Sequence, residues 1–179
     1  DVYKRQVGFL TSGGDCQALN ATMRAVAKVL YRADPETEII GILDGYKGLM
    51  YEEYKVMTPN DFSGILTLGG TILGSSRQPF KNMRKPAEDG MDKVAAMIAT
   101  YKKLQLDCLV ILGGNGTQKT ANLLREEGLN IIHLPKTIDN DLCLTDHTPG
   151  FGSAAKYIAS TILEIAHDLS LIHISEPTR

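Results

Sequence analysis

The sequence predicts an α/β fold, a doubly wound and mainly parallel sheet with helices on both faces, which is a Rossmann-like three-layer sandwich. Three observations support this prediction. Short apolar runs alternate with segments of helical periodicity along the chain. Each of these runs stops at glycine or polar residues that are typical of turns. The chain has 179 residues, 43% of them hydrophobic, which is enough for one domain with a substantial core.

In the first half of the chain, "VGFLT" at 7–11 is an apolar run that ends in a tight turn, which predicts a strand. Apolar residues spaced three and four apart predict a helix over 19–30. "EIIGIL" at 38–43 predicts the second strand, and "DGYKGLM" at 44–50 predicts a glycine-rich loop. Pro59 suits the first turn of a short helix over 59–67.

The second half continues the alternation, starting from a second glycine-rich loop, "GGTILGSSRQPF". The remaining predicted strands are 107–112 and 130–134, and the remaining predicted helices are 88–104, 117–127 and 152–168. Gly128 is expected to end the second of these helices. The segment "PKTIDNDLC", which follows the last strand, is expected to be a polar loop.

Both ends of the chain differ in character from the rest. "DVYKRQ" joins abruptly onto a buried-type strand, and "LSLIHISEPTR" follows a regular helix without a stop signal. Both strings resemble translated sequencing-adaptor sequence, so residues 1–6 and 170–179 are interpreted as non-native tails. Natural frayed termini are the alternative. On the first interpretation the chain is a fragment, and its fold is truncated.

The net charge of −2 and the lack of a basic block do not indicate binding to nucleic acid or to a membrane surface. Small molecules and other protein chains are therefore the expected partners. Cys16, Cys108 and Cys143 are odd in number and lack metal-type spacing. They are interpreted as reduced thiols of a cytoplasmic protein.

Three unusual loops follow predicted strands: "SGGD", "GGNGT" and "PKTIDND". In a parallel sheet they would meet beyond the carboxyl ends of the strands, where ligands bind. A glycine turn that leads into a helix offers free N–H groups and a positive dipole to phosphate oxygens. A tight strand-to-helix connection also needs glycine without any ligand, so each turn alone is weak evidence. The pattern of a P-loop and the G-x-G-x-x-G dinucleotide spacing are both missing.

The segment "TIDND" adds carboxylates to these turns. Asp139 and Asp141 alternate in an extended loop, so both could lie near a bound phosphate, one accepting a hydroxyl proton and the other helping to hold a metal ion. An Asx-rich turn that bonds its own backbone is the structural alternative. Together with Lys136 and Arg77, the group predicts a site for phosphoryl transfer to an alcohol.

The motifs "GFLTSGGDCQALNATMRAV", "GILDGYKGLM", "GGTILGSSR", "GGNGT" and "PKTIDNDLCLTD", in this order, resemble the N-terminal half of the 6-phosphofructokinase family. The resemblance covers nearly all of residues 7–168. It implies transfer of the γ-phosphoryl group of ATP, with Mg²⁺, to the 1-hydroxyl of fructose 6-phosphate in glycolysis. Residues 7–150 would form the nucleotide-binding lobe, and 151–169 would begin the second lobe. The 179 residues alone are expected to be inactive.

By motif position, the resemblance implies roles for individual residues. Asp139 would be the catalytic base, Thr137 would contact the reactive end of the sugar phosphate, and Asp141 would support the magnesium or the transferred group. The residues expected around the nucleotide and its phosphates are Gly14, Tyr46, Arg77, Gly114, Asn115, Gly116 and Thr117. The resemblance also implies a homo-oligomer, a dimer or tetramer, for the full-length protein.

Two further positions concern regulation. Arg24 corresponds to a helix position that binds an allosteric nucleotide in bacterial members of the family, and Lys28 lies one turn later where arginine is often found. A solvated helix face is the alternative interpretation.

Two departures from the family pattern concern the donor and the metal. Asn115 stands where an acidic metal ligand is usual, so a neutral amide oxygen would take its place. Gly116 leaves room for a nucleotide, where the pyrophosphate-dependent branch has aspartate, whereas Lys136 matches that branch. ATP is the expected donor because lysine is compatible with ATP phosphates. The alternatives are a pyrophosphate-dependent enzyme, a related sugar-alcohol or NAD kinase, and a nucleotide-binding module without activity.

Overall fold

The computed structural model describes residues 4–14, 18–143 and 145–171, with side chains as far as residue 167. The strands are β1 (Gln6–Ser12), β2 (Glu38–Ile42), β3 (Tyr54–Met57), β4 (Cys108–Gly113) and β5 (Ile131–Pro135). The α-helices are α1 (Ala18–Ala33), α2 (Tyr46–Tyr51), α3 (Lys93–Lys103), α4 (Asn115–Glu126) and α5 (Phe151–Leu171). Three short 3₁₀ helices are η1 (Pro59–Phe62), η2 (Ile65–Thr67) and η3 (Phe80–Asn82).

The strands form one sheet in the order β3-β2-β1-β4-β5. The strand β1 pairs in parallel with β2 on one side and with β4 on the other, and β4 pairs in parallel with β5. The chain therefore winds outward from β1 in one direction, then crosses back and continues in the other. The switch in direction lies between β1 and β4, and in such sheets it opens a crevice at the carboxyl ends of the strands.

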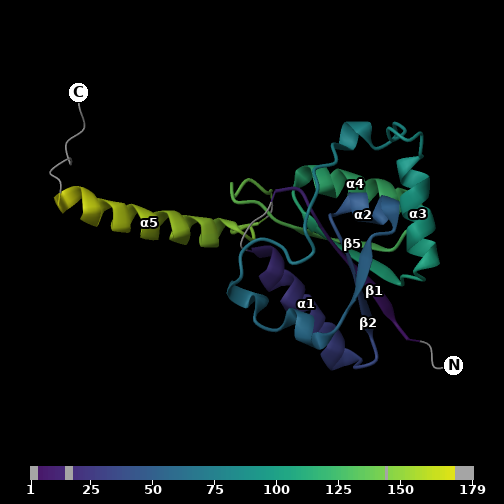
Figure 1. Ribbon diagram of the computed structural model, residues 1–179, viewed down its shortest axis with the longest axis horizontal. Coiled ribbons are helices and arrows are strands. Elements are labelled where there is room, and N and C mark those ends of the chain that lie inside the picture. The colour runs from purple at the N-terminus through teal and green to yellow at the C-terminus, as the bar shows by residue number, and fades with distance from the viewer. Residues whose placement is uncertain (1–3, 15–17, 144, 172–179) are drawn as a thin grey trace.

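Helices cover both faces of the sheet, as the predicted three-layer fold requires (Figure 1). On one face, α2, α3 and α4 pack on the strand residues Leu10, Ile40, Ile42, Leu109 and Ile111. On the other face, α1, η1 and η2 pack on Val7, Phe9, Ile39, Val110 and Leu112. Neighbouring residues of each strand thus contribute to opposite cores, because side chains alternate across a strand. This confirms the fold class expected from the sequence.

Several element boundaries differ from the prediction. The segment 44–50, expected to be a loop, contains most of α2, whose apolar side chains Tyr46, Leu49 and Met50 are buried. The antiparallel edge strand β3 was missed because only Met57 of its four residues is buried, so its apolar signal is weak. The predicted helix 59–67 is two separate 3₁₀ helices, with left-handed Gly64 (φ 75°) between them.

Helix ends follow capping chemistry. The helix α3 begins at Lys93 and not at Glu88, because the carboxylate of Asp92 accepts hydrogen bonds from the amides of Val94 and Ala95 and caps the helix there. The helix α4 begins at Asn115, two residues before the predicted start. As predicted, it ends before Gly128, whose φ of 93° and hydrogen bond to the Arg125 carbonyl stop the helix.

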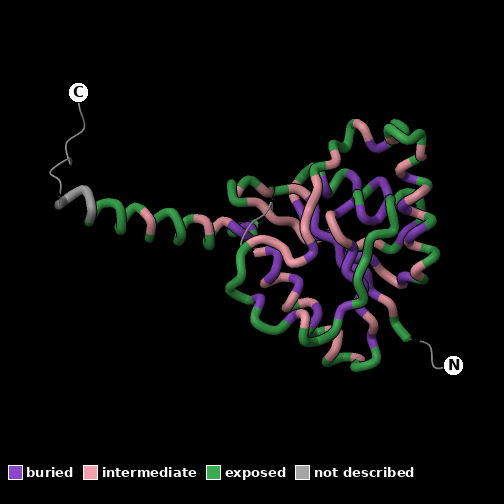
Figure 2. Tube along the Cα trace, viewed as in Figure 1, coloured by how far each residue is buried: buried purple, intermediate pink, exposed green. Residues whose placement is uncertain are grey.

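The two ends of the described chain extend the regular structure. Gln6 begins β1, so the segment interpreted as a tail contributes this residue to the sheet. At the other end α5 continues to Leu171, past the predicted end near residue 168, and projects away from the sheet (Figure 1). Most of its length is exposed (Figure 2), including Tyr157, Ile158, Ile162, Leu163 and Ile165. In the part of the chain that is described, no helix has the length and apolarity needed to cross a membrane.

Candidate phosphoryl-transfer site

The two glycine turns lie side by side at the switch point of the sheet. Ser12, the last residue of β1, pairs with Gly113, the last residue of β4. A Cβ atom on Gly113 would lie 2.6 Å from the Ser12 carbonyl oxygen, so only glycine permits this approach. After β1, Gly13 has a φ of 91°, a conformation that glycine adopts without strain. The glycines therefore bring the two turns together as well as clearing space for a ligand.

Helix α4 begins at this point. Gly114 is its N-cap, and the first bond of the helix runs from the Gln118 amide to the Gly114 carbonyl at 2.9 Å. The amides of the first helical residues have no partner within a helix, and they carry the positive end of its dipole. This end of α4, Asn115–Thr117, is therefore suited to anionic oxygens.

A network of polar side chains holds the glycine-rich loop that carries Arg77. The fully buried Asn20 donates to the Leu68 carbonyl and accepts from the Ile72 amide, both at 2.9 Å. Thr11, also fully buried, donates to the Gly74 carbonyl at 2.7 Å. The Ser75 hydroxyl donates to the Gly13 carbonyl at 2.8 Å. The loop is thus fixed against the first glycine turn.

Lys136 connects all three loops. It follows β5, and its amide donates to the Gly113 carbonyl at 3.1 Å. Its ammonium group donates to the Gly14 carbonyl across the crevice. One positive charge is therefore held between the two glycine turns, where an anion would bind.

The carboxylates of "TIDND" lie in the loop after Lys136. Asp139 and Asp141 are exposed, and the Asp139 amide donates to the Thr137 hydroxyl oxygen at 3.1 Å. The structural alternative was a turn in which Asp or Asn side chains bond their own backbone. In this bond the accepting side chain is that of Thr137, and Asp139 contributes only its backbone amide. The Asp139 carboxylate makes one long contact, 3.4 Å from the Thr137 hydroxyl. Asp139 is one of the residues that line the adjoining cavity.

The cavity at these loops has a volume of about 790 Å³. Its lining includes eight of the predicted site residues, namely Gly14, Arg77, Gly114, Asn115, Lys136, Thr137, Asp139 and Asp141. A second cavity of about 320 Å³ adjoins it and adds Gly116 and Thr117, while sharing Gly14, Arg77, Gly114 and Lys136. The two cavities form one groove along the carboxyl ends of β1 and β4. Segments up to 133 residues apart in the sequence, from Ser12 to Thr145, meet there.

Three predicted residues do not line this groove. Tyr46 is buried in the core, and its hydroxyl donates to the Thr117 carbonyl at 2.8 Å, so the structure places it behind the second cavity. Burial also raises the pKa of its phenol. Arg24 and Lys28 line a separate cavity of about 380 Å³ between α1 and η1, where Arg24 donates to the Phe62 carbonyl.

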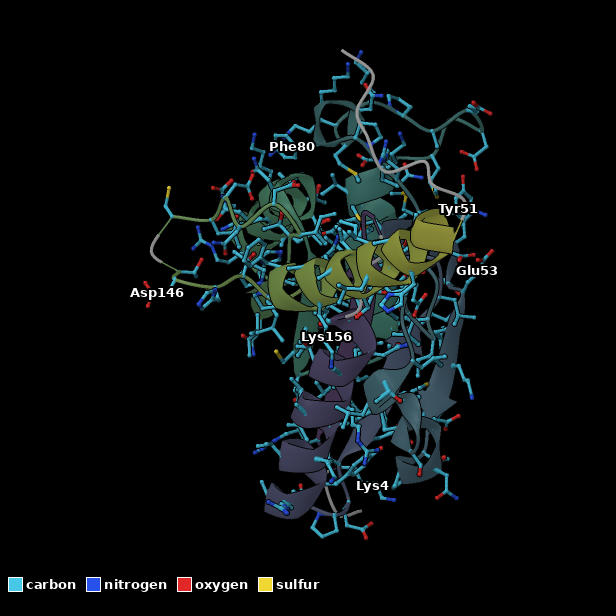
Figure 3. All side chains as sticks on the ribbon, turned by 90° about the vertical axis from the view of Figure 1, so that its left-hand side faces the viewer. Lys4, Tyr51, Glu53, Phe80, Asp146 and Lys156 are labelled. Atoms are coloured by element: carbon cyan, nitrogen blue, oxygen red, sulfur yellow. The ribbon has the colours of Figure 1, made fainter. Side chains whose placement is uncertain are left out.

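The structure adds lining residues that sequence reasoning did not single out. Gln118 lies one turn after Asn115 on α4, so helical spacing alone could have indicated it. Gln78 and Phe80 follow Arg77 and line the second cavity. Thr145 lines the first cavity from the loop that carries Asp146, and no sequence signal marks it. Figure 3 labels Phe80, the first residue of η3, and Asp146, on the loop between β5 and α5.

No group of three or more His, Cys, Asp or Glu side chains able to hold a metal occurs among the described residues. The cavity does offer oxygen donors from Asn115, Asp139 and Asp141. Mg²⁺ is usually bound through one or two carboxylates together with water and substrate phosphates. This lining fits such a shared site and not a site built from protein ligands alone.

The fold and the groove define a class, the doubly wound α/β proteins that bind anionic ligands at the switch point of the sheet. Sequence comparison identifies the family within that class. The family model described as "Phosphofructokinase" matches residues 6–173. The chain belongs to the phosphofructokinase family.

Relatives in this family are similar along most of the chain. "ATP-dependent 6-phosphofructokinase" of Spirochaeta thermophila is 53% identical over 94% of this chain and 46% of its own length. "ATP-dependent 6-phosphofructokinase 3" of Bacteroides thetaiotaomicron is 42% identical over 94% of this chain and 49% of its own length. The chain therefore spans about half the length of these curated relatives.

Solved structures agree with the family. The phosphofructokinase from Saccharomyces cerevisiae superimposes with a TM-score of 0.79 at 27% identity, covering 93% of this chain and 24% of that chain. A pyrophosphate-dependent phosphofructokinase from Nitrosospira multiformis gives a TM-score of 0.77 at 25% identity, covering 96% and 44%. The sequence relatives are named for ATP and this solved structure for pyrophosphate, so the donor has to be argued from individual residues.

Proposed function

We propose that the full-length protein that contains this chain transfers the γ-phosphoryl group of ATP to the 1-hydroxyl of fructose 6-phosphate, a step of glycolysis. One observation carries the proposal: Asp139, Lys136, Arg77 and the glycine turns line one continuous groove. The relatives named ATP-dependent 6-phosphofructokinase support the choice of substrates. Residues 7–150 would form the nucleotide-binding lobe, and 151–169 would open the second lobe.

The proposed reaction assigns a task to each part of the groove. Asp139 takes the proton of the 1-hydroxyl, whose oxygen forms the new bond to the γ-phosphorus while the bond to the bridging oxygen of ADP breaks. Lys136 and Arg77 neutralise charge on the phosphates, as does the N-terminus of α4. Thr137 contacts the reacting end of the sugar phosphate.

The oxygen donors in the cavity suit Mg²⁺ bound together with the nucleotide. Asp141 would hold the ion with the amide oxygen of Asn115 and phosphate oxygens, and the ion would supply charge neutralisation at the phosphates. Both residues are exposed, which leaves room for the water ligands that Mg²⁺ retains.

ATP is the proposed donor because of the space around Gly116. A Cβ atom added there would meet nothing within 4 Å, so the groove is open where the nucleotide sugar would lie. Lys136 is compatible with either donor because its ammonium group faces the turn at Gly14 and carries one positive charge.

Further properties follow the family resemblance as proposals. The cavity at Arg24 and Lys28 would bind an allosteric nucleotide. Its three cationic side chains, Arg24, Lys28 and Arg32, support this, as does a lining that shares no residue with the groove. The full-length protein would act as a homo-oligomer, dimer or tetramer, in the cytoplasm.

A coupled assay with the purified full-length protein tests the proposal. Formation of fructose 1,6-bisphosphate from ATP, Mg²⁺ and fructose 6-phosphate is the expected result. Turnover with pyrophosphate and none with ATP would show that pyrophosphate is the donor. Nucleotide binding without turnover on either donor would identify a binding module and overturn the proposed reaction.

A further inference from the structure

A short segment, Thr148–Gly150, runs along the loop that carries Thr137 and Asp139. The Thr137 amide donates to the Pro149 carbonyl at 3.2 Å, and Thr137 forms an isolated parallel bridge with Gly150. Immediately after this segment the chain enters α5. The loop with the candidate base is therefore supported from behind by the residues that precede α5.

Thr148 is the buried centre of this support, with 3% of its surface exposed. Its hydroxyl donates to the Thr137 carbonyl at 2.9 Å. Its amide donates to the Asn140 side-chain oxygen at 3.0 Å. These two bonds end on residues on either side of Asp139, while Thr148 itself lines neither cavity of the groove.

Asn140, the second residue held by Thr148, has a left-handed backbone with a φ of 54°. Such a conformation is uncommon for residues other than glycine, and asparagine is among those that tolerate it. The bond from the Thr148 amide fixes the side chain of Asn140. Asn140 stands between Asp139 and Asp141 in the sequence. Both carboxylates line the same cavity.

We propose that Thr148 is a positioning residue for phosphoryl transfer, holding Thr137 and Asn140 and, through them, the Asp139 carboxylate. This inference rests on the function proposed above. Asp139 needs such support because it lies on an exposed loop and, among the described residues, its carboxylate has only the long contact with Thr137. Displacing a reacting group by about 1 Å can cost about 10²-fold in rate.

The test compares Thr148→Val with Thr148→Ser in the full-length protein. Valine keeps the shape of threonine but cannot donate to the Thr137 carbonyl, whereas serine keeps the hydroxyl. We expect Thr148→Val to lower kcat by about 10- to 100-fold, with the KM for ATP within about twofold of wild type. Thr148→Ser should restore most of kcat.

Thr100→Val is the matched control, because Thr100 is also buried and donates to one carbonyl, that of Ala96, but lies on α3 away from the groove. It should lower the melting temperature without changing kcat. Asn140→Gly is the second variant: glycine accepts the left-handed backbone but removes the oxygen that Thr148 holds. It should also lower kcat, and it decides the question if Thr148→Val does not fold.

The results separate this inference from the proposed function. An inactive wild-type protein would refute the proposed function. An active wild type with Thr148→Val or, where that variant does not fold, Asn140→Gly retaining kcat within about twofold would overturn the positioning role alone. Equal loss of kcat in Thr148→Val and Thr148→Ser would also overturn it, because the hydroxyl would then not be the group that matters.

Discussion

Gly116→Asp is the substitution that most directly tests the nature of the phosphoryl donor. Gly116 is exposed in the first turn of α4, and a Cβ atom there would meet nothing within 4 Å. The new carboxylate would lie at the positive end of the helix, which favours it by about 0.3–1 kcal/mol. The variant should therefore fold as well as the wild type, so any loss of activity would come from the groove.

The electrostatic cost can be approximated from the position of residue 116 in the second cavity. A carboxylate about 5 Å from one phosphate charge costs about 3 kcal/mol at an effective dielectric constant of about 20, and about 0.8 kcal/mol in bulk water. These values correspond to roughly 10²-fold and roughly fourfold in affinity. Because the side chain also fills the space proposed for the nucleotide sugar, we expect the KM for ATP to rise by about 100-fold or more, enough to abolish ATP use at ordinary concentrations.

The assay measures steady-state kinetics with ATP and with pyrophosphate for Gly116→Asp and two controls. Gly116→Asn has the same volume without the charge, and Gly116→Ala adds a methyl group alone. A graded loss, with aspartate the most affected, would show that both charge and volume act on the nucleotide. A KM for ATP within about twofold of wild type in Gly116→Asp would refute the argument from space at this residue.

Three other variants test separate parts of the structure. Asp139→Asn should lower kcat by about 10²–10⁴-fold with an unchanged ATP dissociation constant by calorimetry; a parallel loss of binding would contradict its role as the base. Tyr46→Phe removes the 2.8 Å bond to the Thr117 carbonyl and should cost about 1 kcal/mol, or roughly 2–4 °C in melting temperature; no shift would show that the bond contributes nothing. Hydrogen bonds, first that from Lys55, hold the pKa of Asp61 well below its usual range. A lowered folded-state pKa stabilises the fold above the ordinary aspartate pKa, and this contribution is lost as pH falls. Asp61→Asn should therefore lower the melting temperature at neutral pH and less so in acid below about pH 3, and an equal difference at both would contradict the ionic origin.

The fold was predictable because its strongest signals are local. The runs at β1, β2, β4 and β5 are apolar and end at glycine, proline or polar residues, and α1 has a clear apolar face. By contrast, β3 exposes three of its four residues and joins the sheet at its edge by pairing with β2. Such an edge strand depends on tertiary contacts, which the local pattern does not contain.

The candidate site was predictable as far as the loops that follow the strands. Parallel strands bring "SGGD", "GGNGT" and "PKTIDND" to one edge, and the cavity there contains eight of the predicted residues. The supports of the site were not predictable, because Asn20, Thr11 and Thr148 act through hydrogen bonds to backbone atoms 11 to 63 residues away. Nor did the sequence indicate that Tyr46 lies in the core behind the groove.

The charges that line the larger cavity clarify the role of Asn115. Arg77 and Lys136 balance Asp139 and Asp141, so the charged side chains alone favour neither anion nor cation. The N-terminus of α4 adds about half a positive charge beside them. An acidic residue at position 115 would cancel that half charge, whereas asparagine leaves it in place for the phosphates. On the proposed function, the protein would rely less on its own ligands to hold a metal and more on the nucleotide, whose phosphates would bring negative charge into the groove.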